Sequence, residues 1–415
     1  MNVERFKPYL PFVLFAIIIL SAVFAVEKIN GRFWLNDFKV YYSAAEALLK
    51  GRQVYGVSFG LDTGFYKYAP FVAMLFVPYT FFSYEVASII HFAILSAATI
   101  LTIIILGRLV SKYFLSIKTK TENILMSFAL LCILLHLVRE LHLGNINMLL
   151  LLLASAGLIL SLQSKNILSG IFIGLAIIIK PYFLILVLPF IASGRWRVII
   201  SISVTIIVSL FVPMLFFGYT QNILLHKEWI ESMREHSSYL SSTHTIQSLL
   251  QYYLGLETGK WFQYFLIAAT GAGYFLFFFL MKKRQEKHSS QPFFFVSGYF
   301  CLLAIVPNLV ITDTEHFLLS LPLVMILLRY IYEKKNYLLT SAFIVLIFFY
   351  EGTSTDLLGK NLAQRFEEAG LLGISNLLII ASVLILNFFW WKNPSLPSNS
   401  LKGEPPAQAP FRGKG

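Results

Sequence analysis

The polar residues that could carry chemistry in this chain stand in a few short segments between long apolar ones. The segment LNDFKVYYSAAEALLKGRQVY (35–55) contains Asp37 at the start of a predicted helix. A carboxylate in this position can serve as a general base, because it can accept a proton from a hydroxyl within hydrogen-bond reach. In the structural alternative, Asn36 or Asp37 caps the helix N-terminus and Gly51 closes its C-terminus. The local sequence leaves both roles open.

The next polar segment, GFYKYAPF (64–71), contains Lys67 and Tyr68. Aromatic residues of this kind commonly form a belt at the membrane surface. Lys67 can extend its amine to water, or it can meet a phosphate. The apolar stretch 68–82 is short and has a proline near each end, so we expect a helix that lies in the interface or re-enters it.

The segment VRELHLGNINMLL (138–150) gathers Arg139, Glu140, His142, Asn145 and Asn147 between two apolar runs. An Arg–Glu pair at a helix end is commonly structural. Two amides and a glycine beside the pair favour a lined polar cavity instead. We keep both interpretations.

Two further charged positions interrupt apolar runs. Lys180 stands before a proline within residues 170–191, and a charge at membrane depth is costly, so we expect it at an interface or in a polar cavity, where it could hold a phosphate. In VITDTEHFLLSLP (310–322), His316 follows Asp313 and Glu315. A lone histidine of this kind is normally a satisfied core residue, but the two carboxylates favour a functional role.

The elements that position these residues are predicted to be membrane helices. The chain has 415 residues, of which 57% are hydrophobic and only 13% are charged, whereas soluble proteins carry about 25% charged residues. Repeated long apolar runs predict an all-α, polytopic integral membrane protein. A transmembrane barrel is excluded, because its strands would be about 10 residues long and would alternate apolar with polar residues.

We expect about 12 transmembrane helices, at 9–26, 84–107, 123–138, 147–163, 168–179, 182–193, 198–217, 262–281, 292–311, 316–333, 338–350 and 373–391. The first run is nearer a membrane span in length than the core of a signal peptide, so we take it as a retained anchor. Residues 1–391 then form a single polytopic membrane domain. Its outer loops are 27–83, with interfacial helices, and the large 218–261, while 392–415 is expected to be a disordered cytosolic tail.

The helix at the start of the first outer loop is predicted to be amphipathic. Its apolar residues recur at helical spacing, and its polar residues face the other way: Phe38, Tyr41, Tyr42, Ala45, Leu48 and Leu49 against Lys39, Ser43, Glu46 and Lys50. We therefore expect it to lie on the membrane surface with its apolar face down.

The formal net charge of +12 would suggest nucleic acid as a partner of a soluble protein. Here the basic turns RLVSKYFLSIKTK (108–120), GRWR (194–197) and KKRQEKH (282–288) fall on one side of the membrane if 68–82 does not span. The positive-inside rule places this side and both termini in the cytosol. The excess charge therefore needs no nucleic acid, and the large polar loops face outward.

These segments, in this order, resemble glycosyltransferase family 87, the polyprenol-phosphate-mannose-dependent α-mannosyltransferases with a GT-C fold. The resemblance rests on the following stretches, which cover most of the first 325 residues: NDFKVYYSAAEALLKGRQVY, YKYAPF, GNINMLLLLL, GIFIGLAIIIKPYFLILVLPFI, TIQSLL and TEHFLLSLP. The chain departs from the family pattern at Ala69-Pro70, Gly144-Asn145 and Glu315-His316, where the family often has two prolines, Gly-Gln and paired histidines.

The resemblance implies a membrane hexosyltransferase that moves a sugar, mannose by family analogy, from a polyprenyl-phosphate donor to a hydroxyl of a glycolipid or glycan. It implies Asp37 as the general base, a cavity open to membrane lipids, and an extracytoplasmic site in a bacterial plasma membrane. The attack would invert the anomeric centre in one displacement.

The candidate site residues fall into two further groups. For the donor phosphate or sugar we expect Lys180, His316, Arg139, Asn145, Asn147, Tyr68 and Lys67, and for the acceptor or sugar Tyr41, His142, Gln247 and Glu315. We expect no metal and no cofactor, because the outer loops lack a DxD motif and Cys132 and Cys301 form no ligand framework. The alternative function is a transporter or flippase for a lipid-linked sugar, which would predict inverted repeats.

Overall fold

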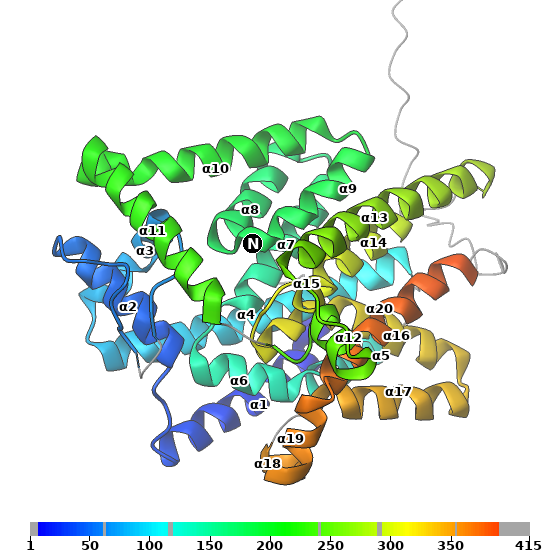
Figure 1. Cartoon of the computed structure of the whole chain (residues 1–415). Coiled ribbons are helices and arrows are strands. Elements are labelled where there is room, and N and C mark those ends of the chain that lie inside the picture. Colours follow the sequence, from blue (N-terminus) through cyan, green and yellow to red (C-terminus); the bar gives the residue numbers. More distant parts are fainter. Residues whose placement is uncertain are drawn as a thin grey trace, which may run out of the picture.

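The computed structural model describes residues 7–60, 64–114, 119–239, 242–288, 293–352 and 355–389. These ranges fold into helices joined by turns and loops (Figure 1). The one extended pairing within them is an isolated bridge between Ser58 and Phe65. The prediction of an all-α chain is confirmed, while the predicted tail at 392–415 lies outside the described residues.

The helices follow one another closely along the chain. Up to residue 217 they are η2 (Lys7–Tyr9), α1 (Leu10–Ile29), α2 (Asn36–Leu49), α3 (Pro70–Phe76), η3 (Val77–Phe81), α4 (Tyr84–Tyr113), α5 (Thr119–Leu131), α6 (Leu134–Leu143), α7 (Asn147–Leu162), α8 (Asn166–Ile179), η4 (Pro181–Leu186), α9 (Val187–Ala192) and α10 (Trp196–Phe217). Beyond residue 217 they are α11 (Tyr219–Tyr239), α12 (Ile246–Leu254), α13 (Lys260–His288), α14 (Phe293–Ala304), α15 (Val306–Leu309), η5 (Thr314–Ser320), α16 (Leu321–Lys334), α17 (Tyr337–Glu351), α18 (Thr355–Leu358), α19 (Lys360–Glu368) and α20 (Leu371–Phe389).

Six helical stretches in the described residues are long and apolar enough to cross a membrane: Lys7–Ile29, Tyr84–Tyr113, Trp196–Phe217, Lys260–Lys283, Thr314–Lys334 and Leu371–Phe388. A seventh is the pair α5 and α6, which is bent by 62° at its break. These stretches support a polytopic membrane protein. Several segments predicted as single spans are broken: 123–138 contains the bend, 182–193 is η4 followed by α9, and 292–311 is α14 followed by α15.

Helices α7, α8 and α10 pack side by side, and α10 forms the outer edge of this layer with most of its surface exposed. Helix α8 packs against α7 on one side and α10 on the other. Gly170 and Gly174 of α8 make this possible, since a Cβ on either would lie within 3 Å of a side chain of α10. Small residues at such contacts let helix backbones approach closely.

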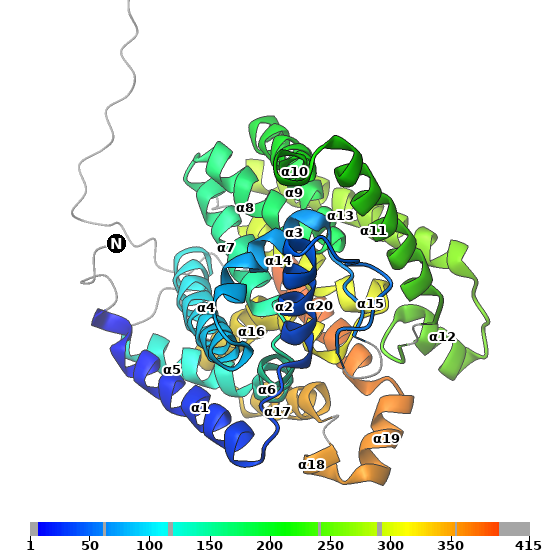
Figure 2. The ribbon, with the colours of Figure 1, turned by 90° about the vertical axis from the view of Figure 1, so that its left-hand side faces the viewer.

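Helix α2 lies across this body and contacts α3, η3, α4 and α6 (Figure 2). Phe38, Tyr41, Ala45 and Leu48 on its predicted apolar face are buried. The expectation that this face lies on the membrane surface is therefore wrong, because protein covers it. Helix α2 forms part of the wall of the site.

The predicted N-cap of α2 is also wrong. The N-cap is Leu35, which is fully buried with a φ of 45°, and it makes no side-chain capping bond. Asn36 and Asp37 already belong to the helix, and the Asp37 carboxylate bonds to a distant element instead. The prediction for Gly51 is confirmed, since it follows the last turn with a φ of 62°.

The corner between α6 and α7 approaches the start of α2 very closely. Gly144 ends α6 with a φ of 68°. A Cβ at this position would lie 2.8 Å from Cβ of Phe38 and 3.1 Å from Cβ of Leu35. The glycine therefore allows both the left-handed turn and the contact with α2.

We predict that Gly144→Ala destabilises the protein more than Gly51→Ala. Both glycines have positive φ, so each alanine costs about 1 kcal/mol of backbone strain. Only Gly144 adds a steric contact, which costs a further 1–3 kcal/mol or so, because nothing lies within 4 Å of a Cβ at Gly51. Thermal unfolding of the purified variants in detergent measures the difference, and equal melting temperatures would contradict the close contact.

Candidate functional site

Four breaks in the helices bring the predicted polar residues together. They are the first turn of α2, the corner between α6 and α7, the end of α8 and the start of η5. Lys180 stands at the end of α8 in extended conformation, with φ −131° and ψ 104°. Pro181 follows it, and a residue before proline is pushed out of helical conformation. The break turns the Lys180 side chain away from the α8 surface and into the protein.

The ammonium group of Lys180 is the centre of the site. Its Nζ donates to Oδ1 of Asn147 at 2.7 Å and to Oδ1 of Asn145 at 3.2 Å, and it lies 3.0 Å from Nε2 of His316. A lysine has three donors and no acceptor, so these contacts use its full capacity. The side chain is almost completely buried.

Asn145 carries the interaction from Lys180 to two carboxylates. Its oxygen accepts from Lys180, and its Nδ2 donates to Oδ2 of Asp37 at 2.9 Å and to Oε1 of Glu315 at 3.2 Å. The donor-only ammonium fixes which end of the amide carries the oxygen. The amide thus links α2, α8 and η5.

Asn147 makes the equivalent connection to Glu140. Its oxygen accepts from Lys180, and its Nδ2 donates to Oε2 of Glu140 at 2.9 Å. The other oxygen of Glu140 accepts from the backbone N–H of Met148 at 2.9 Å. Glu140 is fully buried, and this carboxylate balances the buried Lys180 through one amide.

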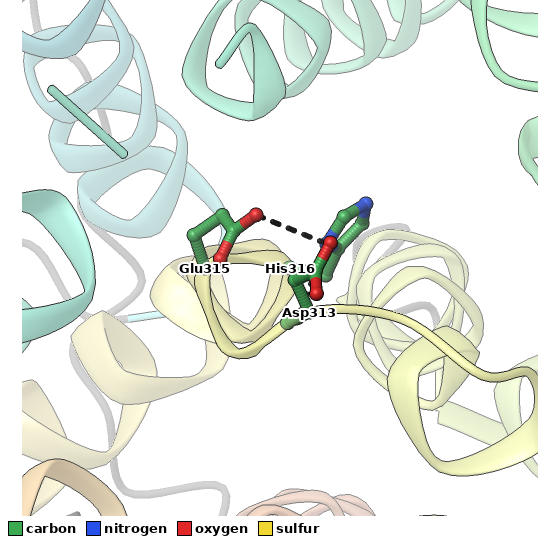
Figure 3. A group of neighbouring side chains, drawn as sticks. All are labelled: Asp313, Glu315 and His316. Carbon is green, nitrogen blue, oxygen red and sulfur yellow. Dashed lines mark hydrogen bonds and ion pairs between the residues drawn. The ribbon is translucent and has the colours of Figure 1, made fainter. Parts of the chain in front are cut away.

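The predicted group Asp313, Glu315 and His316 lies at the start of η5 (Figure 3). One ligand atom from each lies within 4.8 Å of the others. Arg139 Nε lies 3.1 Å from Oε2 of Glu315, and His316 Nδ1 lies 3.1 Å from the carbonyl oxygen of Asp313. A carbonyl only accepts, so Nδ1 donates and Nε2 accepts from Lys180. Arg139 and Lys180 therefore already occupy ligand atoms of Glu315 and His316, and the donor set does not favour a metal ion.

Of the carboxylates that the two asparagine amides hold, Asp37 is the one with free hydrogen-bonding capacity in the described residues. Its Oδ2 accepts from Asn145, and its Oδ1 has no hydrogen bond within the described residues. Burial raises the pKa of the Asp37 carboxyl to about 6, while the nearby Lys180 charge opposes the shift and Asp313 adds to it. Both oxygens of Glu140 and both of Glu315 are occupied.

Lys67 is a cation with free capacity at the site. Its ammonium has no hydrogen bond or ion pair in the part of the chain that the structure describes, although its backbone oxygen accepts from Trp229 Nε1 at 2.9 Å. Burial lowers the pKa of Lys67, and the charges of Asp37 and Asp313 oppose this shift. The Lys67 ammonium therefore interacts electrostatically with these carboxylates.

Two predicted tyrosines form one wall beside Asp37. The hydroxyls of Tyr41 and Tyr68 lie 3.0 Å apart, and their rings meet edge to face at 5.3 Å. The Tyr68 backbone oxygen accepts from the hydroxyl of Tyr55 at 2.8 Å. These contacts fix the 64–69 segment against α2.

Two predicted residues are not brought into the group. His142 Nδ1 lies 2.8 Å from Oε2 of Glu27, which ties α6 to α1. Gln247 donates to Thr258 Oγ1 and to the Gly259 carbonyl, which joins both ends of the α12 segment. Their contacts provide structural roles, and no contact connects either residue to Lys180 or Asp37 among the described residues.

Sequence reasoning missed His91. Its Nε2 lies 2.9 Å from the Gly144 carbonyl, its Nδ1 lies 3.2 Å from the Tyr79 hydroxyl, and its ring stacks on Phe38 at 4.1 Å. His91 thus contacts Phe38, which follows Asp37, and Gly144, which precedes Asn145. The signal was a single histidine within an apolar run, since a polar side chain at membrane depth is a functional candidate by default.

Comparison with known proteins identifies the family. No curated protein matches the chain. The model of glycosyltransferase family 87 matches residues 65–307, which is more than half of the 415 residues. The matched range contains Lys67, Arg139, Asn145, Asn147 and Lys180, whereas Asp37 and His316 lie outside it. With its apolar helices and its buried polar site, the chain belongs to glycosyltransferase family 87 and is a membrane glycosyltransferase.

Proposed function

We propose that this enzyme transfers a hexosyl residue, mannosyl by family analogy, from a polyprenyl-phosphate donor to an acceptor hydroxyl, with inversion. The observation that carries the proposal is a carboxylate, Asp37, with one oxygen free of hydrogen bonds in the described residues, whose charge acts on an ammonium, Lys67, that has no partner there. Transfer from a lipid phosphate needs these two functions: a base for the attacking hydroxyl and a cation for the leaving phosphate.

Asp37 serves as the base in this proposal. Asn145 holds Oδ2 and so orients the carboxylate, while Oδ1 remains able to accept a proton. The pKa of about 6 favours this role, because a base works best when its pKa is near the working pH and it is still ionised there. The nearby Asp313 is exposed, and it is the rival carboxylate for the same role.

The cation roles differ from those expected. Lys180 was expected to bind the donor phosphate, but its three donors are already occupied. We assign it to holding Asn145 and, through it, Asp37. Lys67 and the partly exposed Arg139 are left to stabilise the leaving phosphate.

The membrane placement follows the charge pattern. We propose a GT-C fold with about 12 crossings, in which the shorter apolar segments α7, α8, η4 with α9, α14 and α17 also contribute. The basic turns lie in the cytosol with both termini, so that the site opens on the extracytoplasmic side of a bacterial plasma membrane. The acceptor is a glycolipid or glycan, and no metal takes part, since Lys67 and Arg139 supply the charge.

We predict that Asp37→Asn lowers the transfer rate by about 10²–10⁴, the usual contribution of a general base. The substrate is a labelled polyprenyl-phosphate mannose, and the same assay in chelator measures metal dependence, with full wild-type activity expected. The variant should melt no lower than the wild type at pH 7, because it removes a carboxylate whose raised pKa makes its ionised form costly.

Three outcomes would count against this assignment. Substantial activity of Asp37→Asn, with a complete loss in Asp313→Asn, would move the base to Asp313. Loss of wild-type activity in chelator would contradict metal independence. Sugar movement across the bilayer without a new glycosidic bond would favour the transporter or flippase.

We predict that kcat/KM falls about tenfold per pH unit below about pH 6 and is level above it. The base must be ionised, and the Asp37 pKa in the folded protein is about 6. The free energy of unfolding should depend on pH in the opposite direction. A raised carboxyl pKa stabilises the folded state at low pH, and this contribution is lost as the pH rises from about 4 through 6. An acid limb near pH 4 would contradict the assignment.

We predict that substitution of Lys67 affects donor binding, whereas substitution of Lys180 affects stability. Lys67→Met should raise the KM for the donor about tenfold or more with little change in melting temperature. Lys180→Met should lower stability by about 3–5 kcal/mol, because it leaves buried partners unpaired. Lys39→Met is the control, since Lys39 is exposed on α2. An unchanged KM in Lys67→Met would contradict its phosphate role.

A further inference from the structure

A tyrosine beside the site has a hydroxyl without a hydrogen-bond partner in the described residues. Tyr182 stands two residues after Lys180, and its hydroxyl is buried without a hydrogen bond in the described residues. Its ring meets the His316 ring edge to face, at 5.8 Å between centroids. It stacks on Phe183 at 5.4 Å, and the Phe183 side chain is fully buried. These ring contacts fix the position of the Tyr182 hydroxyl oxygen.

An unpartnered tyrosine hydroxyl needs an explanation that a serine or threonine does not. Ser155 and Thr102 are also unpartnered, but they stand in helices. A short side chain in a helix can turn to a carbonyl of its own preceding turn. The tyrosine hydroxyl is held at the far end of a rigid ring and has no such choice. Leaving it buried and unpaired costs about 1–3 kcal/mol.

The surroundings of this hydroxyl indicate what would satisfy it. The charges of Glu140, Glu315 and Asp313 act on it. The carboxylate of Asp313 is exposed, and the hydroxyl of Thr312 is also buried without a partner. A negative environment with hydroxyl donors and a carboxylate acceptor suits a neutral polyol better than a phosphate. Lys67 and Arg139 are the groups that suit the phosphate.

We propose that Tyr182 binds a hydroxyl of the sugar being transferred, with Asp313 as its partner in the same subsite. The inference rests on the proposed function and deepens it, because it divides the donor between two parts of the site. Lys67 and Arg139 take the phosphate, and Tyr182 takes the sugar. His316, held between Lys180 and the Asp313 carbonyl, keeps the Tyr182 ring in place.

Tyr182→Phe tests this proposal, because it removes only the hydroxyl and keeps the ring against His316. The purified full-length protein is assayed with polyprenyl-phosphate mannose, and we expect kcat/KM to fall about tenfold, the value of one lost hydrogen bond. The melting temperature should stay the same or rise, since an unpaired buried hydroxyl disappears. A structural role would instead lower it.

Ligand-binding measurements distinguish recognition of the sugar from recognition of the phosphate. The two probes are polyprenyl-phosphate mannose and polyprenyl phosphate without sugar, each measured by the rise in melting temperature. Tyr182→Phe should lose stabilisation only by the first, whereas Lys67→Met should lose it by both.

The matched control is Tyr274→Phe. Tyr274 also has a buried, unpartnered hydroxyl, but it lies in α13 against Phe278 and not beside His316. Its activity should equal that of the wild type. A loss below threefold in Tyr182→Phe, or an equal loss in both variants, would overturn the proposal. An inactive wild type would instead refute the proposed function.

Discussion

The site depends on the burial of one ammonium group. Lys180 is buried at the end of α8, and no carboxylate of the described residues forms an ion pair with it. An isolated charge in such a place is very costly. Asn145 and Asn147 offset this cost in the same way. Each accepts a hydrogen bond from the ammonium with its side-chain oxygen and donates its N–H to a carboxylate. The charge of Lys180 is thus shared with Asp37, Glu315 and Glu140 through two amides, and four separate helix breaks are bound to one another.

This arrangement divides the polar residues into those that hold the site together and those that remain available to bind substrate. The hydrogen-bonding groups of Lys180, Glu140 and both asparagines are engaged with one another and with Asp37, Glu315, His316 and the Met148 backbone. Asp37 keeps one oxygen, and Lys67 keeps its ammonium. A rigid centre with unused groups at its edge is the arrangement that orients a base and a cation before the substrate arrives. The breaks at Pro181 and Gly144 are therefore as important as the charges, because they aim the side chains.

The sequence was sufficient to predict an all-helical membrane protein and to select most of the residues that meet at the centre. Lys180, Asn145 and His316 stood out because polar groups are rare in apolar runs. Roles were harder to predict, because they depend on which donors are already used. Lys180 was expected from the sequence to be free to bind a phosphate, but all three of its hydrogen-bond donors are used within the protein. The N-cap at Leu35, the covered face of α2 and the supporting role of His91 arise from contacts between helices distant in sequence, which no local pattern contains.

The central claim is a single displacement at the sugar, and the anomeric configuration of the product tests it most directly. Purified enzyme would receive a polyprenyl β-phosphate sugar and a glycan acceptor, and the one-bond C1–H1 coupling of the new linkage would be measured by NMR. The account predicts an α-glycoside as the only product, since the acceptor hydroxyl attacks opposite the leaving phosphate. A β-glycoside would show retention, which one base and one displacement cannot give, and would contradict the account.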